Sequence, residues 1–343
     1  MKILLQNAWL TRGGLACLLW PLAQCFGLLV RLRRTLYHRG ILRSERFKAP
    51  VVVVGNVIAG GAGKTPLVIA LVRHLQAQRV KVGVVSRGYG RSGSDCMEVT
   101  AAAPLAQTGD EPALIHKLTG APVFVSGKRT QALRALLAVH PDTAVVICDD
   151  GLQHYALQRD IEIAAFDDRG VGNGWLLPAG PLREPWPERR QQGLNLVLHT
   201  GQRPAFEGFR STRQLADDAW SAGGDQLALD GLRGRPVTAL AGIANPEAFF
   251  GMLRDRGLML EASIALPDHH VFIEADLAKL KGRTVLCTEK DAVKLFALPA
   301  ATGLNILAVP LVFSPEQAFF AAFDALLTPL LSPLPSKDGH QIA

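Results

Sequence analysis

Val51-Val-Val-Val-Gly-Asn-Val-Ile-Ala-Gly-Gly-Ala-Gly-Lys-Thr65 is the stretch that decides the fold. An apolar strand runs into a glycine loop, and Lys64 opens a helix that we expect to reach about Gln78. Glycines let such a backbone curl until its N–H groups converge on phosphate oxygens at the positive end of the helix. The usual first glycine falls at Ile58, so the motif is a GGxGKT variant of GxxxxGK[ST].

This motif predicts a P-loop that binds ATP. In such loops the lysine reaches the β- and γ-phosphates and the following hydroxyl binds Mg²⁺. These are the roles expected for Lys64 and Thr65. The alternative is a glycine turn that binds nothing, which the coincidence of strand, loop, Lys-Thr pair and helix argues against. The predicted ATP-binding residues are Gly60, Gly61, Ala62, Gly63, Lys64, Thr65 and Pro66.

A P-loop needs an acidic partner at the end of a neighbouring strand, and Ala144-Val-Val-Ile-Cys-Asp-Asp150 supplies one. Ligands of open parallel sheets bind at the carboxyl ends of the strands, which is where Asp149 and Asp150 fall. Carboxylates there hold Mg²⁺ directly or through water. A pair of acids after a strand is also a common loop feature, but beside a P-loop we predict that both belong to the metal site together with Thr65.

The rest of the chain alternates strands and helices, which is typical of a parallel sheet covered on both faces. After the arm at 1–48, the pattern predicts a P-loop domain at 49–225. A polar, glycine-containing stretch near 203–234 is the candidate linker, and a smaller α/β domain follows at 235–330, ending in a helix from Pro315. Residues 331–343 are expected to be a disordered tail. The expected strands are 51–54, 81–86, 122–126, 143–148, 161–166, 194–199, 236–241, 258–264, 284–288 and 306–310.

Composition excludes disorder and argues against nucleic acid as a partner. The 343 residues are 48% hydrophobic and 20% charged, as in folded enzymes, and the net charge is +7. Residues 1–48 alone hold nine Lys or Arg against one acid, whereas the remainder is close to neutral. The five cysteines show no metal-ligand spacing and are read as thiols of a reducing compartment.

The basic arm also contains an uncharged apolar run, Gly13 to Val30, followed at once by arginines. The run is at the lower limit for spanning a bilayer, and Pro21 lies inside it. An apolar helix followed by arginines favours an anchor at an anionic membrane surface, on the cytoplasmic side. The alternative is a helix that packs on its own domain or makes an oligomer contact.

Several motifs occur in an order that resembles one family. They are Gly60-Gly-Ala-Gly-Lys-Thr-Pro66, Ser86-Arg-Gly-Tyr-Gly-Arg91, Gly109-Asp-Glu-Pro112, Asp149-Asp-Gly-Leu-Gln-His154, Pro178-Ala-Gly-Pro-Leu-Arg-Glu-Pro185, Asp268-His-His270 and Thr288-Glu-Lys-Asp291. With the apolar arm they closely resemble the tetraacyldisaccharide 4′-kinases, the lipid A kinases of Gram-negative bacteria. The resemblance implies transfer of the ATP γ-phosphate to the 4′-hydroxyl of a tetraacylated glucosamine disaccharide 1-phosphate at the inner membrane.

The same resemblance assigns residue roles. It implies that Asp110 is the base that receives the hydroxyl proton and that His269 is its partner, with adjacent His270 as the alternative partner. Without the family resemblance, the favoured interpretation of Asp110 is a cap at the start of the following helix. Lys64 completes the catalytic set that the resemblance implies. His154 resembles the family's histidine near the metal site, with a loop histidine as the alternative. Arg183, in a proline-rich loop, and Arg129, near the start of a helix, are candidates to place a guanidinium on phosphate, with surface arginines as the alternative. Glu111 is a further predicted supporting residue.

Thr288-Glu-Lys-Asp291 resembles the base-reading NKxD loops of GTPases with the lysine out of register. The motifs leave two rival functions open. A GTPase metallochaperone of the same P-loop branch would require a Cys/His cluster and an in-register NKxD motif. A non-catalytic ATP-dependent scaffold at the membrane would not need Asp110 or His269.

Overall fold

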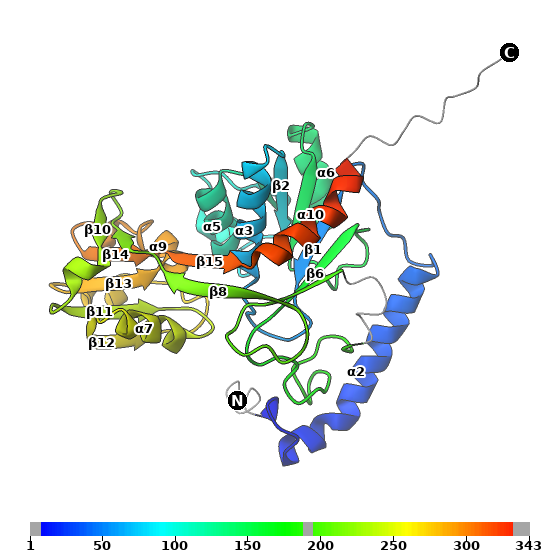
Figure 1. Ribbon diagram of the computed structural model, residues 1–343, viewed down its shortest axis with the longest axis horizontal. Helices are drawn as coiled ribbons and strands as arrows, with labels where there is room; N and C mark the ends of the chain where they lie inside the picture. Colours follow the sequence, from blue (N-terminus) through cyan, green and yellow to red (C-terminus); the bar gives the residue numbers. More distant parts are fainter. Residues whose placement is uncertain (1–7, 188–194, 332–343) are drawn as a thin grey trace.

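The computed structural model describes residues 8–187 and 195–331 as two α/β bodies and a long amino-terminal helix (Figure 1). The predicted tail from 332 onward, the start of the strand expected at 194 and the first seven residues of the arm lie outside the described residues. A two-stranded antiparallel ribbon of β8 (Phe209–Leu215) and β15 (Leu311–Pro315) runs between the two bodies.

The first body is built on a nine-stranded sheet of order β15-β8-β7-β6-β1-β5-β2-β4-β3. From β8 to β4 every neighbouring pair is parallel. Its elements are β1 (Val51–Gly55), α3 (Lys64–Ala77), β2 (Val82–Ser86), β3 (Met97–Glu98), α4 (Leu105–Thr108), α5 (Asp110–Thr119), β4 (Val123–Val125), α6 (Arg129–Val139), β5 (Val145–Asp149), β6 (Ile161–Phe166), β7 (Leu196–His199), β8 (Phe209–Leu215), β15 (Leu311–Pro315) and α10 (Gln317–Leu331).

Apolar side chains cover both faces of this sheet, as the strand pattern predicts. One core cluster joins α3, α5 and α10 to one face, with Leu71, Ile115 and Phe323 fully buried. A second cluster joins α6 and the loops after β5 to the other face. Both faces of β1 are therefore buried, which explains why its sequence is an unbroken run of valines. The predicted α/β fold with a P-loop-type parallel sheet and helices on both faces is confirmed.

The second body has a six-stranded sheet of order β10-β9-β14-β13-β11-β12. Its central strands β14, β13, β11 and β12 are parallel, and β9 and β10 add an antiparallel edge. Its elements are β9 (Asp218–Trp220), β10 (Gln226–Ala228), the 3₁₀ helix η2 (Leu229–Leu232), β11 (Pro236–Ala241), α7 (Pro246–Asp255), β12 (Met259–Ala265), α8 (Glu274–Ala278), β13 (Thr284–Thr288), α9 (Glu289–Leu295), the 3₁₀ helix η3 (Pro299–Ala301) and β14 (Asn305–Val309).

The connection between the bodies differs from the sequence prediction. The polar stretch expected to be a linker contains three strands, β8 to β10, and the chain returns to the first sheet through β15 and α10. Residues 311–331 therefore do not belong to the second body, and the last helix begins at Gln317 rather than Pro315. The linker prediction failed because β8 (FRSTRQL) is mostly exposed and pairs mainly with β15, so it carries no apolar run.

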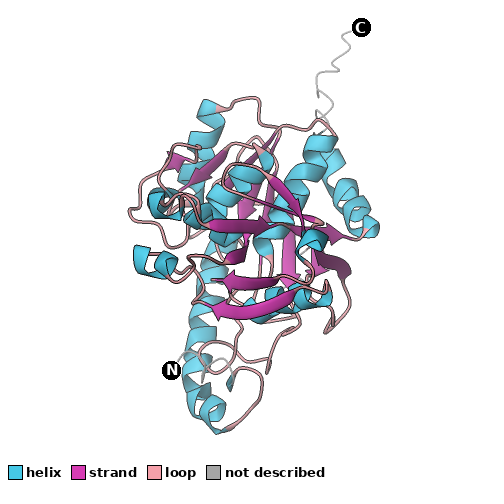
Figure 2. Cartoon of the chain, turned by 90° about the vertical axis from the view of Figure 1, so that its left-hand side faces the viewer, coloured by secondary structure: helices cyan, strands magenta, loops and turns pink. Residues whose placement is uncertain are grey.

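The amino-terminal helix α2 (Gly14–His38) docks on the first body along one narrow stripe. Its buried residues are Ala16, Ala23 and Gly27, and a Cβ added at Gly27 would lie 2.7 Å from a methyl of Leu176. By length and composition the helix could cross a membrane. In the view of Figure 2 the long helix at the bottom of the picture extends beyond the strands of the two sheets.

Candidate active site

The P-loop is held open by bonds to its carbonyl oxygens. Asn56 Nδ2 donates to the carbonyl of Gly60 at 2.8 Å, and Thr200 Oγ1 donates to that of Ala62 at 2.9 Å. A trans peptide points its N–H opposite to its C=O, so these bonds turn the adjoining N–H groups the other way, as phosphate binding requires. Gly63, directly before α3, has φ +72°, a conformation in which a side chain would be strained.

Lys64 and Asp150 face each other across the loop. The Lys64 ammonium lies 3.5 Å from Asp150 Oδ1, and Arg183 Nη1 lies 3.4 Å from the same oxygen. Burial opposes the charge of Asp150, but the two cations outweigh it and lower the pKa of its carboxyl. Arg129, which is 5% exposed, donates to the Asp150 backbone carbonyl at 3.0 Å. The structure thus brings together four of the predicted site residues around the end of β5.

Asp149 is different, because it is buried without a cation in contact. Its Oδ2 accepts from Ser86 Oγ at 3.1 Å, whereas its buried Oδ1 has no hydrogen-bond partner among the described residues. Burial, together with the carboxylates of Glu111 and Asp150, raises the pKa of Asp149 to about 7. An unpartnered buried carboxylate oxygen beside a P-loop fits a magnesium ligand.

No group of three or more His, Cys, Asp or Glu in the described part of the chain is placed to hold a metal by itself. This agrees with Mg²⁺, which keeps several waters and takes further ligands from nucleotide phosphates. Thr65 lies in the first turn of α3, next to Lys64. The residues present therefore fit the ion, which Asp149 and Thr65 would hold, with Asp150 beside them.

Asp149→Asn is expected to stabilise the metal-free protein at high pH. The folded state keeps the Asp149 proton up to about pH 7, whereas an unfolded chain releases it near pH 4. The free energy of unfolding therefore falls as pH rises from about 4 to 7, and the uncharged amide of Asp149→Asn removes this loss of stability. We expect the melting temperature to rise by about 2–4 °C at pH 8 and less toward pH 4.

The exposed Asp142→Asn is the matched control and should show no such gain. An unchanged melting temperature for Asp149→Asn at pH 8 would contradict the assignment.

The second half of the site joins the two bodies. Asp110 begins α5 in the first body, and His269 lies in the loop after β12 in the second. His269 Nδ1 lies 3.1 and 3.0 Å from the two Asp110 carboxylate oxygens. Burial opposes the charge of Asp110, but the His269 hydrogen bond and nearby lysines outweigh it and lower the pKa of the carboxyl. The hydrogen bond that His269 donates to Asp110 raises the pKa of His269, and burial and the Lys290 charge oppose that rise.

The neighbouring histidine has a different partner. His270 Nε2 lies 2.9 Å from Asp276 Oδ2, within the second body. The sequence left His269 and His270 as alternatives because adjacent residues cannot be ranked without backbone geometry. The chain places His269 at φ +62°, which turns its ring toward Asp110. Geometry therefore pairs Asp110 with His269.

Glu111 links the two halves of the site. Its carboxylate lies 3.2 Å from the Lys290 ammonium on α9, and its charge acts on buried Asp149. His154 lies in the loop after β5, where burial and then the Arg129 charge lower its pKa to about 4 and keep it neutral. All of the predicted site residues are thus placed around one region, although their roles stay predictions.

Sequence reasoning missed three residues in this region. Ser86 ends the strand next to β5, and its position at a carboxyl end was the available signal. Lys290 stands in a motif that resembles a base-reading loop with the lysine out of register, but it lies among acidic residues at the interface of the two bodies. Arg213, on the ribbon strand β8, places its guanidinium against Gly63, where a Cβ would displace it; no sequence signal pointed to it.

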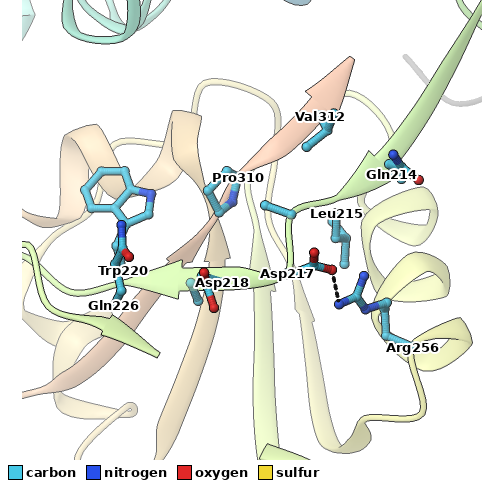
Figure 3. Close-up of a pocket in the computed structure, with 11 residues that line it drawn as sticks. Gln214, Leu215, Asp217, Asp218, Trp220, Gln226, Arg256, Pro310 and Val312 are labelled. Atoms are coloured by element: carbon cyan, nitrogen blue, oxygen red, sulfur yellow. Dashed lines mark hydrogen bonds and ion pairs between the residues drawn. The ribbon is translucent and has the colours of Figure 1, made fainter. Parts of the chain in front are cut away.

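A separate pocket of about 550 Å³ lies at the foot of the ribbon (Figure 3). It is lined by the end of β8, by β9 and by residues around β15, and an Asp217–Arg256 ion pair of 2.8 Å closes one side. None of the predicted site residues lines it. The pocket is therefore distinct from the P-loop site.

Comparisons with known proteins agree with these motifs. The model of the LpxK family, described as tetraacyldisaccharide-1-P 4′-kinase, matches residues 15–328. A tetraacyldisaccharide 4′-kinase of Polaromonas naphthalenivorans is 71% identical over 99% of this chain and 99% of its own, and one of Polaromonas sp. JS666 is 72% identical over 98% and 100%. A crystal structure of LpxK from Aquifex aeolicus in complex with ATP is 28% identical, with a TM-score of 0.79 over 93% of this chain and 100% of that one. The family expected from the motifs is thereby confirmed, and the chain belongs to the tetraacyldisaccharide-1-P 4′-kinase family.

Proposed function

We infer that this chain is an ATP-dependent kinase of lipid A biosynthesis. It transfers the γ-phosphate to the 4′-hydroxyl of a tetraacylated glucosamine disaccharide 1-phosphate. The observation that carries the proposal is the P-loop lysine beside a buried carboxylate pair, joined through Glu111 to an Asp110–His269 pair. Relatives named tetraacyldisaccharide 4′-kinase that match this chain over nearly its whole length support the choice of substrate.

The first half of the site binds and orients ATP. Backbone N–H groups of residues 60–65 donate hydrogen bonds to the phosphate oxygens. Lys64 neutralises the charge that develops on the transferring phosphoryl group. Asp149 and Thr65 would hold Mg²⁺, which would neutralise charge on the phosphates when bound. Arg183, which pairs with Asp150 beside Lys64, would move onto a phosphate oxygen. The task of this half is positioning and charge neutralisation.

The second half of the site receives the proton. Asp110 is ionised and faces the interface of the two bodies, where a sugar hydroxyl would approach its carboxylate. In the transfer the hydroxyl oxygen forms a bond to the γ-phosphorus, the bond to the ADP oxygen breaks, and the hydroxyl proton passes to Asp110. His269 orients that carboxylate through its Nδ1 contact.

Transfer of labelled γ-phosphate from ATP to the disaccharide 1-phosphate tests this function. The label should appear in the lipid product, and ATP should be preferred over GTP. Hydrolysis of ATP without lipid labelling would favour the membrane scaffold, and a preference for GTP would favour the metallochaperone. Either outcome would overturn the proposal.

The amino-terminal helix is the proposed membrane contact, at the cytoplasmic face of the inner membrane. Because one stripe of α2 is docked on the body, the helix would lie in the interface rather than cross the bilayer. Its other faces expose large apolar residues, and Arg31 and its neighbours follow the apolar run as anchors for anionic lipid headgroups. The exposed apolar residues are Leu15, Leu18, Trp20, Leu22, Leu28, Leu29 and Leu32. Nucleic acid is not a proposed partner.

Leu18→Asn, Leu22→Asn and Leu29→Asn combined should weaken binding to anionic vesicles at least about tenfold, since each buried leucine contributes about 1.5–3 kcal/mol. These side chains are 75%, 58% and 63% exposed, so the docked stripe stays intact. Vesicle sedimentation measures the change. Leu227→Asn on β10 is the matched control. Equal sedimentation of the triple variant and the wild type would place the docking surface elsewhere.

A further inference from the structure

Lys290 is the feature of this region that the proposed mechanism does not use. It lies on the first turn of α9, and its side chain is only 15% exposed. Its ammonium lies 3.2 Å from Glu111 Oε1, 3.2 Å from Asp268 Oδ1 and 3.9 Å from Asp110 Oδ2. Burial opposes this charge, but the three carboxylates outweigh it and raise the pKa of Lys290. Lys290 is therefore a fixed positive charge.

The same ammonium also contacts the catalytic pair. Lys290 Nζ lies 3.3 Å from His269 Nε2, while His269 Nδ1 faces the Asp110 carboxylate on the other side of the ring. An ammonium has only donors and an ionised carboxylate has only acceptors. The ring between them must therefore carry its hydrogen on Nδ1 and present a lone pair at Nε2.

Asp268 does not provide an alternative partner for Nε2. Its Oδ2 lies 3.7 Å from His269 Nε2, beyond hydrogen-bond distance, whereas its other oxygen accepts from Lys290. A protonated imidazole would direct an Nε2–H toward the ammonium, and two donors would then oppose each other. Charged and titratable groups face His269 from three elements and a neighbouring tyrosine. Helix α5 supplies Asp110 in direct contact and Glu111 through Lys290, and the loop of His269 itself supplies Asp268. Helix α9 supplies Lys290 in direct contact and Lys294 beyond Asp110, and the Tyr89 ring centroid is 5.0 Å from that of His269.

We propose that Lys290 is a positioning residue that holds His269 neutral, with its hydrogen on Nδ1, and so keeps Asp110 oriented and ionised as the base. The inference rests on the proposed function for its catalytic meaning. An imidazolium would keep the Nδ1 contact but would add a positive charge against Asp110 and weaken it as a proton acceptor. Because Lys290 and His269 belong to the second body and Asp110 to the first, the ring lies between its two partners only when the two bodies are together.

Nitrogen NMR of histidine-labelled full-length protein in detergent tests this directly, because the two ring nitrogens have different signals in each protonation state. The His269 signals are assigned by their loss in His269→Gln. At pH 8 the wild type should show a protonated Nδ1 and an unprotonated Nε2. In Lys290→Met the pH at which the ring becomes an imidazolium should rise by at least about half a unit, because the opposing charge is gone. Lys290→Arg should restore most of the wild-type value.

Lys294→Met is the matched control. It removes an ammonium 3.7 Å from Asp110 on the same helix, but Lys294 donates to the His270 carbonyl and does not contact His269 Nε2. Its His269 signals should stay at their wild-type positions. In kinase assays the acidic limb of kcat should move to higher pH in Lys290→Met, which loss of a purely structural contact would not cause.

Three results would overturn the proposal. They are an imidazolium or an Nε2–H ring in the wild type at pH 8, an unchanged midpoint in folded Lys290→Met, and an equal shift in Lys294→Met. If Lys290→Met does not fold, the wild-type spectrum still decides. The spectrum needs no turnover, so it tests the His269 proposal separately from the kinase assignment. Either one can fail while the other holds.

Discussion

Lys64→Ala and Asp149→Ala are each expected to lower kcat/KM at least about a hundredfold, the scale for losing a preorganised charge partner. Lys64 is the P-loop cation, and its removal would leave Asp150 with Arg183 as its remaining side-chain cation contact. Asp149 offers the one buried carboxylate oxygen at the end of β5 that has no partner among the described residues. Steady-state kinetics with ATP and the lipid substrate measure both losses.

The surface pair Lys81 and Asp142 supplies matched controls. Both side chains are more than half exposed and pair with each other on the same body. Lys81→Ala and Asp142→Ala should leave kcat/KM within about twofold, as is usual for surface substitutions. Turnover near the wild-type level in Lys64→Ala or Asp149→Ala would remove the P-loop assignment.

Asp110→Ala and His269→Ala should each reduce kcat by about 10²–10⁴, and their losses should not add. The two side chains share one hydrogen-bonded contact across the interface of the bodies, so removing either disables the other. The double variant should be little worse than the poorer single variant. ATP affinity should stay near the wild-type value in all three, because neither residue contacts the P-loop.

His270→Ala is the neighbouring control for this cycle. His270 pairs with Asp276 rather than Asp110, so its loss should cost much less than that of His269. Strictly multiplicative losses for Asp110 and His269 would mean that they act independently. A large fall in ATP affinity for Asp110→Ala would make it a metal or structural residue instead.

The sequence predicted the sheet well because its signals were local and redundant. β1 is buried on both faces, and its valine run, the following glycines and the Lys-Thr pair all specify one strand–loop–helix unit. Asp149 was predictable for the same reason, because it ends an apolar strand. The ribbon was not predictable. β15 is stabilised by pairing with β8, about a hundred residues away, and β8 has no apolar run.

Contacts between the two bodies were also beyond local patterns. Nothing in Asp268-His-His270 distinguishes two adjacent histidines, and the choice depends on the positive φ of His269. Lys290 could not be placed because its three carboxylate partners come from α5 and from the loop after β12. Family resemblance supplied Asp110 and His269, whereas periodicity alone would have left them as a helix cap and a loop residue.

The most direct test of the kinase assignment is the position of the new phosphate. Wild-type protein, ATP, Mg²⁺ and tetraacylated disaccharide 1-phosphate are incubated, and phosphorus NMR of the purified lipid locates the added group. We predict one new phosphate monoester on the 4′ carbon, formed by the wild type and by Lys81→Ala but lost in Lys64→Ala. A product without a second phosphate, or with the phosphate on any other hydroxyl, would contradict the assignment.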